Sequence, residues 1–594
     1  MTDTRSRRLR KVLIANRGEI AVRIAQAAAE HGLTSVAVYA DADADALHVA
    51  VADEAWALPG DTVAETYLSI PALLDVARRS GADAVHPGYG FLSESAAFAR
   101  AVVAAGLTWI GPAPETIEAL GDKVTARGIA ARVGAPLVAG TDGPVRSAED
   151  AVAFAREHGV PIVIKAAHGG GGRGMRIVHR IEDVAEQYAS AVREATLAFG
   201  RGECFAEQYL ERPRHVEVQV LGDGRGRVVV VGTRDCSTQR RHQKLVEEAP
   251  APALTPQQDQ RIRQGAHDIC AAVSYAGAGT VEFLVGASGA VSFLEVNTRL
   301  QVEHPVTEVT TGVDLVIEQF RIAEGRGPSI DAPPAPRGHA LEFRINAEDP
   351  GRGFLPSPGR IDVFDAPGGP GIRIDAGVRA GSPVPAAFDS LVAKLVVWAP
   401  TRAAAIERAR VALARFRIDG VPTLLPFHRR LVDEPRFRDA DGGGMHTRWV
   451  EEECAWLDGL AAPRSDAPGA AIASSWIEID GRRHALRLPA ALLAGARVVA
   501  GEETTAASPE ERAEARAEAR AVVRAVVRAE GGGTLRTWAV DDGAEVSDGE
   551  PVAVVEAMKM ETTIPASASG VLRRRVEPGA QLRAGEVIAD IVPR

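Results

Sequence analysis

The chain has 594 residues, of which 46% are hydrophobic and 25% charged, and its net charge is −11. This length predicts several domains, and the acidic balance argues against a nucleic acid as the main partner. The four cysteines form no C-x-x-C pair, and the apolar run from Val12 to Ala15 is too short for a signal or membrane segment, so we expect a cytoplasmic protein without a membrane span.

Residues 11 to about 120 alternate short β-branched runs with alanine-rich stretches. The runs are KVLIAN, TSVAVY, ADAVHP and LTWIG. This alternation is typical of βαβ units, and it predicts a parallel sheet.

The next region combines a predicted helix over residues 148–158 with the strand PIVIKA, which leads into a glycine-rich loop over residues 169–174. Backbone amides of such a loop can wrap phosphate oxygens, and Lys165 and Arg173 supply positive charge. The loop is not a P-loop, and a merely flexible loop is the alternative. Between residues 205 and 300 the runs HVEVQVLG, RVVVVGT, TVEFLV and VSFLEVN predict an antiparallel sheet.

Three oxygen donors are predicted to meet on this antiparallel sheet. Glu295 and Asn297 are two residues apart on one strand and point to one face, while Glu282 lies roughly opposite across the turn around Ser288. Carboxylates clustered without cations repel one another unless a hard cation such as Mg²⁺ lies among them. The alternative, exposed strand residues, fits less well with the apolar runs around both glutamates.

After about residue 450 the composition shifts toward Ala, Arg, Glu, Gly and Pro. Residues 511–530 contain good helix formers with Glu/Arg pairs, which predicts a solvated helix or a semi-rigid linker. The run SWIEIDGRRHALRLP, residues 475–489, predicts a short hairpin that could be the remnant of a docking domain.

The last 65 or so residues contain an internal repeat, because residues 579–585 resemble residues 543–549. This repeat predicts two similar β halves. Between them Lys559 lies between two methionines at a predicted hairpin tip. A solvated lysine in an apolar hairpin is the alternative. This segment resembles biotinyl domains, in which the lysine of this motif receives biotin; lipoyl domains share the fold, but the flanking methionines favour biotin. The usual Pro-Met-x-Gly turn is replaced by Ala529–Gly533.

Residues 11 to about 450 resemble the biotin carboxylase component of the ATP-grasp superfamily. The matching motifs, in order, are IANRGEIA, HPGYGFLSE, GDK, KAAHGGGGRGM, RHVEVQVLGD, RDCSTQRRHQKLVEEAP, EVNTRLQVEHPVTE, GHALEFRINAED and FLPSPG. The whole chain is therefore similar to the alpha subunits of biotin-dependent acyl-CoA carboxylases. Two positions, His168 and Gln208, differ from the usual form without removing a catalytic group.

The resemblance implies a role for each matching residue. The implied ATP-binding residues are Lys123, Lys165, Gly171, Gly172, Glu207, Leu210, His215, Gln239, His242 and Lys244. Mg²⁺ or Mn²⁺ would be held by Glu282, Glu295 and Asn297, and bicarbonate by Arg299, Gln301 and the Val302 amide. The implied catalytic residues are Arg299, Glu303 as general base, Lys244, and Arg344, which would stabilise the enolate form of biotin.

The expected fold class is multidomain α/β and α+β, with an ATP-grasp domain and a C-terminal all-β biotinyl domain. The expected domains are an N-terminal α/β domain over residues 8–120, the ATP-grasp domain over 121–336, a biotin carboxylase C-terminal domain over 337–450, a linker or docking region over 451–525 and the biotinyl domain over 526–594.

The implied function is carboxylation of biotin on the chain's own carrier domain with ATP and bicarbonate. Carboxybiotin would pass to a separate carboxyltransferase beta subunit acting on acetyl-CoA, propionyl-CoA or a related acyl-CoA, because residues 451–525 leave no room for that activity. Biotin protein ligase, an oligomeric partner copy and a small accessory subunit are further expected partners. The alternatives are another acceptor (methylcrotonyl-CoA, pyruvate or urea), a non-catalytic biotin carrier, and a different ATP-grasp ligase such as a carbamoyl phosphate enzyme.

Overall fold

The computed structural model describes residues 8–60, 62–141, 143–166, 175–199, 201–439, 443–460, 472–479, 482–489, 525–529, 533–557, 560–582 and 585–592. The chain divides into two compact units. The first contains Met1–Leu457 and Ala557–Met560, and the second contains Asp458–Glu556 and Glu561–Arg594.

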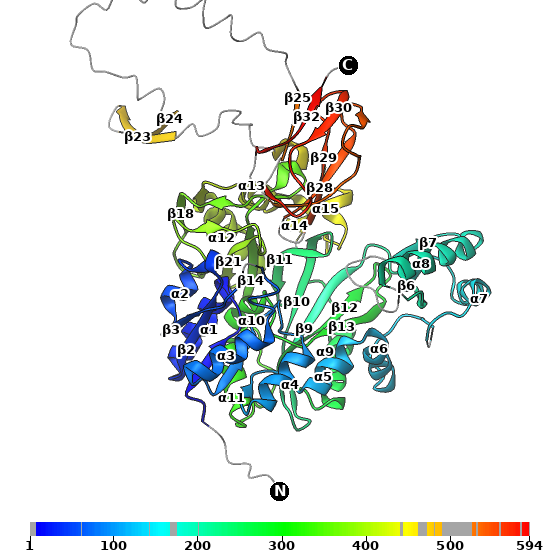
Figure 1. The fold of residues 1–594 in the computed structure, drawn as a ribbon. Coiled ribbons are helices and arrows are strands. Elements are labelled where there is room, and N and C mark those ends of the chain that lie inside the picture. The colour runs from blue at the N-terminus through cyan, green and yellow to red at the C-terminus, as the bar shows by residue number, and fades with distance from the viewer. Residues whose placement is uncertain are drawn as a thin grey trace, which may run out of the picture. The chain divides into compact units, whose positions relative to one another are not determined.

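The first unit begins with a five-stranded parallel sheet, as predicted, in the order β3-β2-β1-β4-β5. Its strands are β1 (Lys11–Ile14), β2 (Thr34–Tyr39), β3 (Glu54–Ala57), β4 (Ala84–His86) and β5 (Thr108–Trp109). The helices around it, in blue tones in Figure 1, are α1 (Gly18–His31), α2 (Leu47–Val51), α3 (Ile70–Ser80), α4 (Ala96–Ala104) and α5 (Pro114–Gly121). Strand β3, at the edge of the sheet, is short and was not predicted from the sequence.

Local sequence signals explain where these helices begin and end. Helix α3 begins after Ser69, whose side chain accepts a hydrogen bond from the Ala72 amide, and it has a proline in its first turn. It ends at Gly81, which adopts a left-handed conformation (φ 69°) that glycine reaches without a steric penalty.

A small three-stranded sheet follows in the order β7-β6-β8. Its strands are β6 (Ile162–Ala166), β7 (Met175–Val178) and β8 (Cys204–Gln208), and the nearby helices are α6 (Lys123–Arg132), α7 (Ala148–His158) and α8 (Val184–Phe199). Strand β6 and helix α7 confirm the predicted strand and helix. The predicted phosphate loop, including Gly171 and Gly172, lies outside the described residues.

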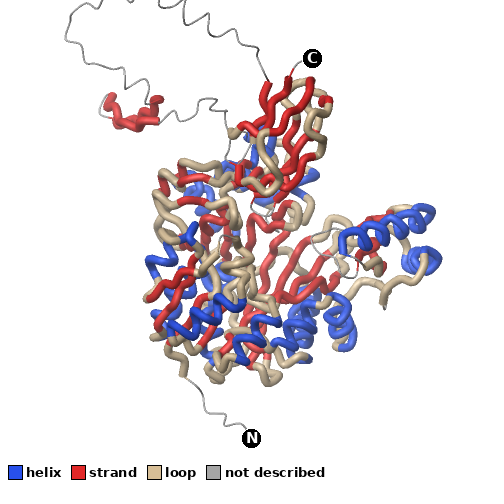
Figure 2. The backbone as a smooth tube through the Cα atoms, viewed as in Figure 1, coloured by secondary structure: helices blue, strands red, loops and turns tan. Residues whose placement is uncertain are grey.

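The centre of the first unit is an eight-stranded antiparallel sheet in the order β13-β12-β9-β10-β11-β14-β21-β19. Its strands are β9 (Arg214–Asp223), β10 (Val228–Arg240), β11 (Gln243–Ala249), β12 (Ala276–Val285), β13 (Val291–Asn297), β14 (His339–Asn346), β19 (Ile372–Ala376) and β21 (Leu391–Ala399). The accompanying helices are α9 (Pro256–Ala272), α10 (His304–Thr311) and α11 (Leu315–Ala323). Figure 2 shows these long strands side by side in red. Residues before and after position 338 thus build one continuous sheet.

The rest of the first unit packs near the end of this sheet. Its helices are α12 (Arg402–Arg415), α13 (Leu425–Leu431), α14 (Pro435–Arg438) and α15 (Trp449–Glu452). Three two-stranded sheets pair β15 (Glu348–Asp349) with β16 (Leu355–Pro356), β17 (Gly359–Arg360) with β20 (Pro383–Val384), and β18 (Val363–Asp365) with β22 (Arg417–Asp419). None of the described helices is both long and apolar enough to cross a membrane.

The second unit is built from strands within its described part. The predicted hairpin is present as β23 (Ile472–Ile479) paired with β24 (Arg482–Pro489). Two four-stranded sheets follow, β25-β32-β30-β27 and β29-β28-β26-β31. Their strands are β25 (Ala525–Arg528), β26 (Gly533–Trp538), β27 (Glu545–Val546), β28 (Pro551–Ala557), β29 (Met560–Pro565), β30 (Gly570–Arg574), β31 (Gln581–Leu582) and β32 (Val587–Val592).

The predicted helix or linker over residues 511–530 is wrong at its C-terminal end. Residues 501–524 lie outside the described part, but Ala525–Arg528 form strand β25, which pairs with β32. Val527 is buried in the core of this unit with Leu535, Val552 and Ile588. Two adjacent β-branched valines favour a strand once such a core is available.

Candidate active site

Two glutamates lie opposite each other at the edge of the long antiparallel sheet. Glu282 on β12 and Glu295 on β13 are register partners, and Asn297 follows two residues later on β13. Burial and the negative charge of Glu282 raise the pKa of Glu295. Asn297 is also buried. The predicted oxygen donors are therefore neighbours, and they suit a hard divalent cation.

Glu282 has cationic neighbours, contrary to the expected cluster of carboxylates without cations. The Lys244 ammonium lies 3.0 Å from one carboxylate oxygen, and His215 Nε2 lies 3.0 Å from the other. Burial alone would raise the pKa of Glu282, but these two groups hold it well below its usual range. The Asn297 side-chain oxygen likewise accepts a hydrogen bond from Arg299 at 2.7 Å, so the fit to a metal depends chiefly on Glu295.

Lys244 lies at the centre of a cluster of buried charged side chains. Its ammonium contacts Glu217 at 2.6 Å, Glu282 at 3.0 Å and Glu303 at 2.6 Å. Burial disfavours a charged amine, but three carboxylates raise the pKa of Lys244 well above its usual value. The lysine is thus held as a cation in the middle of the site.

Glu303, just before helix α10, connects Lys244 to Arg344. The Arg344 Nη2 donates to Glu303 at 3.0 Å, and Nε donates to Glu247 on β11 at 2.6 Å. Glu303 is fully buried. Burial would raise its pKa, but Lys244 and Arg344 hold the pKa of Glu303 well below the usual range, so it is an ionised proton acceptor.

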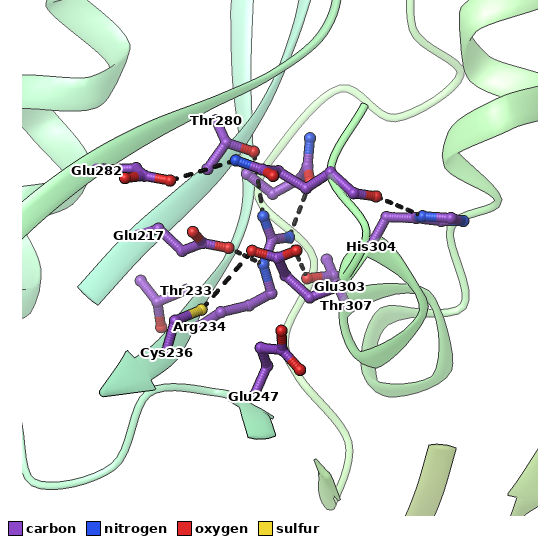
Figure 3. Close-up of polar contacts among 12 residues, drawn as sticks. Glu217, Thr233, Arg234, Cys236, Glu247, Thr280, Glu282, Glu303, His304 and Thr307 are labelled. Atoms are coloured by element: carbon purple, nitrogen blue, oxygen red, sulfur yellow. Dashed lines mark hydrogen bonds and ion pairs between the residues drawn. The ribbon is translucent and has the colours of Figure 1, made fainter. Parts of the chain in front are cut away.

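A second buried cation, Arg234 on β10, lies beside Glu303 and holds the strands together (Figure 3). Its guanidinium donates to Glu217 at 2.5 Å, to Thr307 at 2.9 Å and to Thr280 at 3.1 Å. Cys236 is buried, and its thiol lies 3.8 Å from Glu303 Oε1. Its neighbours are therefore charged and not only apolar.

Arg299 presents its guanidinium between several acceptors. It donates to Gln301 at 2.8 Å, to Asn297 at 2.7 Å and to Glu94 at 2.9 Å. Gln301 also donates to Glu282 at 3.3 Å, so the predicted bicarbonate residues adjoin the predicted metal residues. The next residue, Val302, accepts a hydrogen bond from Lys394 through its carbonyl. A planar guanidinium with a neighbouring amide can bind a planar anion.

The predicted adenine and phosphate residues are more spread out. Glu207 pairs with Lys165 at 2.6 Å and with Arg127 at 3.0 Å. Burial opposes ionisation, but these cations lower the pKa of Glu207, with Lys123 adding a smaller effect. Gln239 on β10 is the register partner of Lys244, and His242 is exposed in the turn between β10 and β11. Leu210 lies near Gly286, at the end of β12.

Four protein-family models match the chain. They are biotin carboxylase N-terminal domain over residues 8–117, carbamoyl-phosphate synthase L chain ATP binding domain over 122–329, biotin carboxylase C-terminal domain over 342–452, and biotin-requiring enzyme over 526–591. A biotin-dependent acyl-coenzyme A carboxylase alpha3 subunit of Mycobacterium leprae is 52% identical over 600 residues, covering 100% of both chains.

This chain belongs to the biotin-dependent carboxylase family. The carboxylase is an enzyme, an ATP-dependent biotin carboxylase joined in one chain to a carrier domain for covalent biotin. The match to the carbamoyl-phosphate synthase model covers its ATP-binding part alone, whereas the Mycobacterium leprae relative matches the whole carboxylase.

Further relatives match the first unit of the carboxylase. A biotin carboxylase of Nostoc is 46% identical over 443 residues, covering 74% of this chain and 98% of the relative. A crystal structure of a Campylobacter jejuni biotin carboxylase is 42% identical with a TM-score of 0.71, covering 75% of this chain and 99% of that one. The biotin carboxylase domain of Hydrogenobacter thermophilus 2-oxoglutarate carboxylase, in complex with MgADP, ADP and bicarbonate, is 44% identical with a TM-score of 0.71, covering 76% and 99%.

Some predicted site residues of the carboxylase cannot be placed. Strand β28 ends at Ala557 and β29 begins at Met560, while Lys559 between them lies outside the described residues, as do Gly171 and Gly172. The predicted β halves on either side of Lys559 are present as strands β25–β28 and β29–β32, and each half contributes two strands to each of the two sheets.

Several charged residues of the cluster were missed by the sequence analysis. They are Glu94, Glu217, Arg234, Glu247 and Lys394. Glu217 and Arg234 stand opposite each other in register on β9 and β10, within otherwise valine-rich strands. The opposite charges of Glu217 and Arg234 could have indicated a buried ion pair. Such an inference would have required knowledge that these two strands pair.

Proposed function

We propose that this carboxylase transfers a carboxyl group from bicarbonate to biotin on its own Lys559, and that a separate carboxyltransferase beta subunit passes the group to an acyl-CoA. The observation that carries the residue assignments is that Glu303 contacts Lys244 and Arg344 at once. A proton acceptor, a cation for phosphate and bicarbonate oxygens, and a guanidinium for the biotin oxygen thereby meet at one point.

On this proposal, Arg299, Gln301 and the Val302 amide bind bicarbonate beside Glu303. A bound anion next to Glu303 raises its affinity for a proton, since like charges favour the neutral form. Glu303 then accepts the bicarbonate proton, and Lys244 neutralises the charge that develops on the phosphoryl and bicarbonate oxygens. Arg344 would bind the ureido oxygen of biotin and stabilise negative charge there. Biotin, when bound, would supply the ureido nitrogen that accepts the carboxyl group. ATP leaves as ADP, its γ-phosphoryl group takes one bicarbonate oxygen and leaves as phosphate, and this phosphate would accept the ureido proton.

The nucleotide side uses the remaining predicted residues. Glu282, Glu295 and Asn297 would hold Mg²⁺ or Mn²⁺, which when bound neutralises phosphate charge. The residues proposed for ATP are Lys123, Lys165, Gly171, Gly172, Glu207, Leu210, His215, Gln239, His242 and Lys244. The pairing of Glu207 with Lys165 supports placing both at one end of the nucleotide.

The acyl-CoA acceptor is supported by the full-length relative, whose name is that of an acyl-coenzyme A carboxylase subunit. The family models leave residues 453–525 unmatched. Because this segment is too short for a carboxyltransferase, it supports a separate beta subunit. A biotin protein ligase would modify Lys559, and the proposed setting is the cytoplasm, with an oligomeric holoenzyme and a small accessory subunit at the 451–525 region.

Carboxyl transfer from labelled bicarbonate tests the proposal. The biotinylated chain is mixed with a candidate beta subunit, ATP and one acceptor at a time, namely acetyl-CoA, propionyl-CoA, methylcrotonyl-CoA, pyruvate or urea. We expect label in an acetyl- or propionyl-CoA product, and none when Arg299→Ala replaces the native chain. Label only in pyruvate or urea would contradict the acyl-CoA assignment.

A further inference from the structure

Glu342 is a fully buried acid with no evident partner. It lies on β14 between Ala340 and Arg344, which share its face of the sheet because strand residues alternate. Its exposed fraction is 0%, and neither of its carboxyl oxygens has a hydrogen-bond partner within the described residues. A buried carboxylate without a partner is strongly destabilising, so its protonation state requires an explanation.

The residue opposite Glu342 is a second glutamate. Glu247 on β11 is its register partner, and side chains directly opposite in an antiparallel pair have Cβ atoms about 4.5–5.5 Å apart. One oxygen of Glu247 accepts the bond from Arg344 Nε at 2.6 Å, while its other oxygen is also buried without a partner. Two facing acids with three unused oxygens are stable only if a proton lies between them.

The surroundings favour a neutral acid at Glu342. On its other side the register partner is the buried Val396, and Ala249, Val306 and Ala340 complete a small apolar cluster with it. The charged groups that act on its pKa are Lys394, Glu247, Arg344 and Glu303. Lys394 is engaged elsewhere, with Glu19 at 3.0 Å and the Val302 carbonyl at 2.9 Å.

The titration tendencies agree with this geometry. Burial raises the pKa of Glu342 well above its usual value. Burial also raises the pKa of Glu247 to about 7, although the Arg344 guanidinium opposes this shift. The proton of the pair therefore belongs to Glu342, and Glu247 remains the ionised partner of Arg344.

We propose that Glu342 carries a proton, donates it to the free oxygen of Glu247 and so acts as a positioning residue for Arg344. The inference rests on the role given above to Arg344 at biotin. With this proton in place, Glu247 is fixed as the acceptor for Arg344 Nε, and Arg344 Nη2 stays on Glu303. A neutral Glu342 also adds no negative charge where charge develops on the biotin oxygen.

Two substitutions in the full chain test this role by bicarbonate-dependent ADP release with free biotin. Glu342→Gln keeps a neutral donor, and we expect a turnover within about threefold of the native chain. Glu342→Met keeps the volume without a donor. We expect its biotin-dependent turnover to fall roughly ten- to a hundredfold, because this corresponds to the free energy of one hydrogen bond to a charged group. The KM for ATP should be unchanged.

Two outcomes would overturn the proposal. If Glu342→Gln loses as much biotin-dependent turnover as Glu342→Met, Glu342 acts as an anion. If Glu342→Met turns over at the native rate, Glu342 contributes packing alone. Circular dichroism and unfolding of each variant identify a fold defect, in which case the infrared measurement on Glu342→Gln decides.

Infrared difference spectroscopy reads the proton directly and needs no activity. Subtracting Glu342→Gln from the native chain should isolate the C=O stretch of a protonated carboxylic acid. The matched control is Glu318→Gln, since Glu318 is a buried acid whose oxygens accept bonds from Ser329, and it should leave that band unchanged. No such band would overturn the proposal. If Arg344→Ala keeps native biotin-dependent turnover, the assignment of Arg344 fails, while the band still reports on Glu342.

Discussion

Replacing Lys244 by methionine should destabilise the first unit, because it removes a cation from among three buried carboxylates. The lysine lies within 3.0 Å of Glu217, Glu282 and Glu303, and the side chains of Glu217 and Glu303 have no exposed surface. Removing one partner of a buried ion pair costs about 3–5 kcal/mol. Each of these carboxylates keeps one other cation, so we expect about 3 kcal/mol, at the lower end of that range.

Urea unfolding followed by intrinsic fluorescence measures this change, with Lys11→Met as the matched control. Lys11 pairs with Glu54 at 2.6 Å, but both side chains are partly exposed, so its loss should cost less than about 1 kcal/mol. Equal effects of the two substitutions would refute the view that Lys244 holds the charge cluster together.

Three further outcomes follow from the structure. Arg299→Ala should reduce ADP release by more than about a hundredfold even with free biotin, since the guanidinium that joins Gln301 and Asn297 is gone; near-native turnover would show that bicarbonate binds elsewhere. Lys559→Ala should abolish carboxyl transfer to an acceptor but leave ATP cleavage with free biotin intact, and loss of both in a folded variant would contradict separate functions in the two units. Stability should fall as the pH drops from 6.5 to about 4, because burial lowers the pKa of His48 and His428 to about 4 and that of His86 to about 3. The unfolded chain takes up these protons first, which removes about 3 kcal/mol for each histidine at pH 4; a flat free energy of unfolding between pH 6.5 and 4 would contradict this.

The strands of the central sheet were predictable where their alternation is regular. The register of Glu282 with Glu295 follows from one short turn, so the sequence predicted it correctly. The addition of β14, β21 and β19 to the same sheet was not predictable, because β11 pairs with β14 across about ninety residues of intervening chain. Local patterns contain no information on such long-range pairing.

The buried charges were harder to predict than the strands. Polar residues that alternate with valines, such as Glu217 and Arg234, look like the solvent face of a half-buried strand. In the structure Thr307 on helix α10 covers this face and bonds Arg234, so the alternating side chains are buried. Motif resemblance therefore located Glu303 and Arg344. Glu247, which bonds Arg344, and its register partner Glu342 emerged only from the strand register.

The most direct test of the whole account is ADP release by the purified chain with free biotin, with and without bicarbonate. We predict that ATP cleavage depends strictly on bicarbonate and that Glu303→Gln removes this dependence along with the activity. ATP cleavage at the same rate without bicarbonate would contradict the proposed carboxylation of biotin.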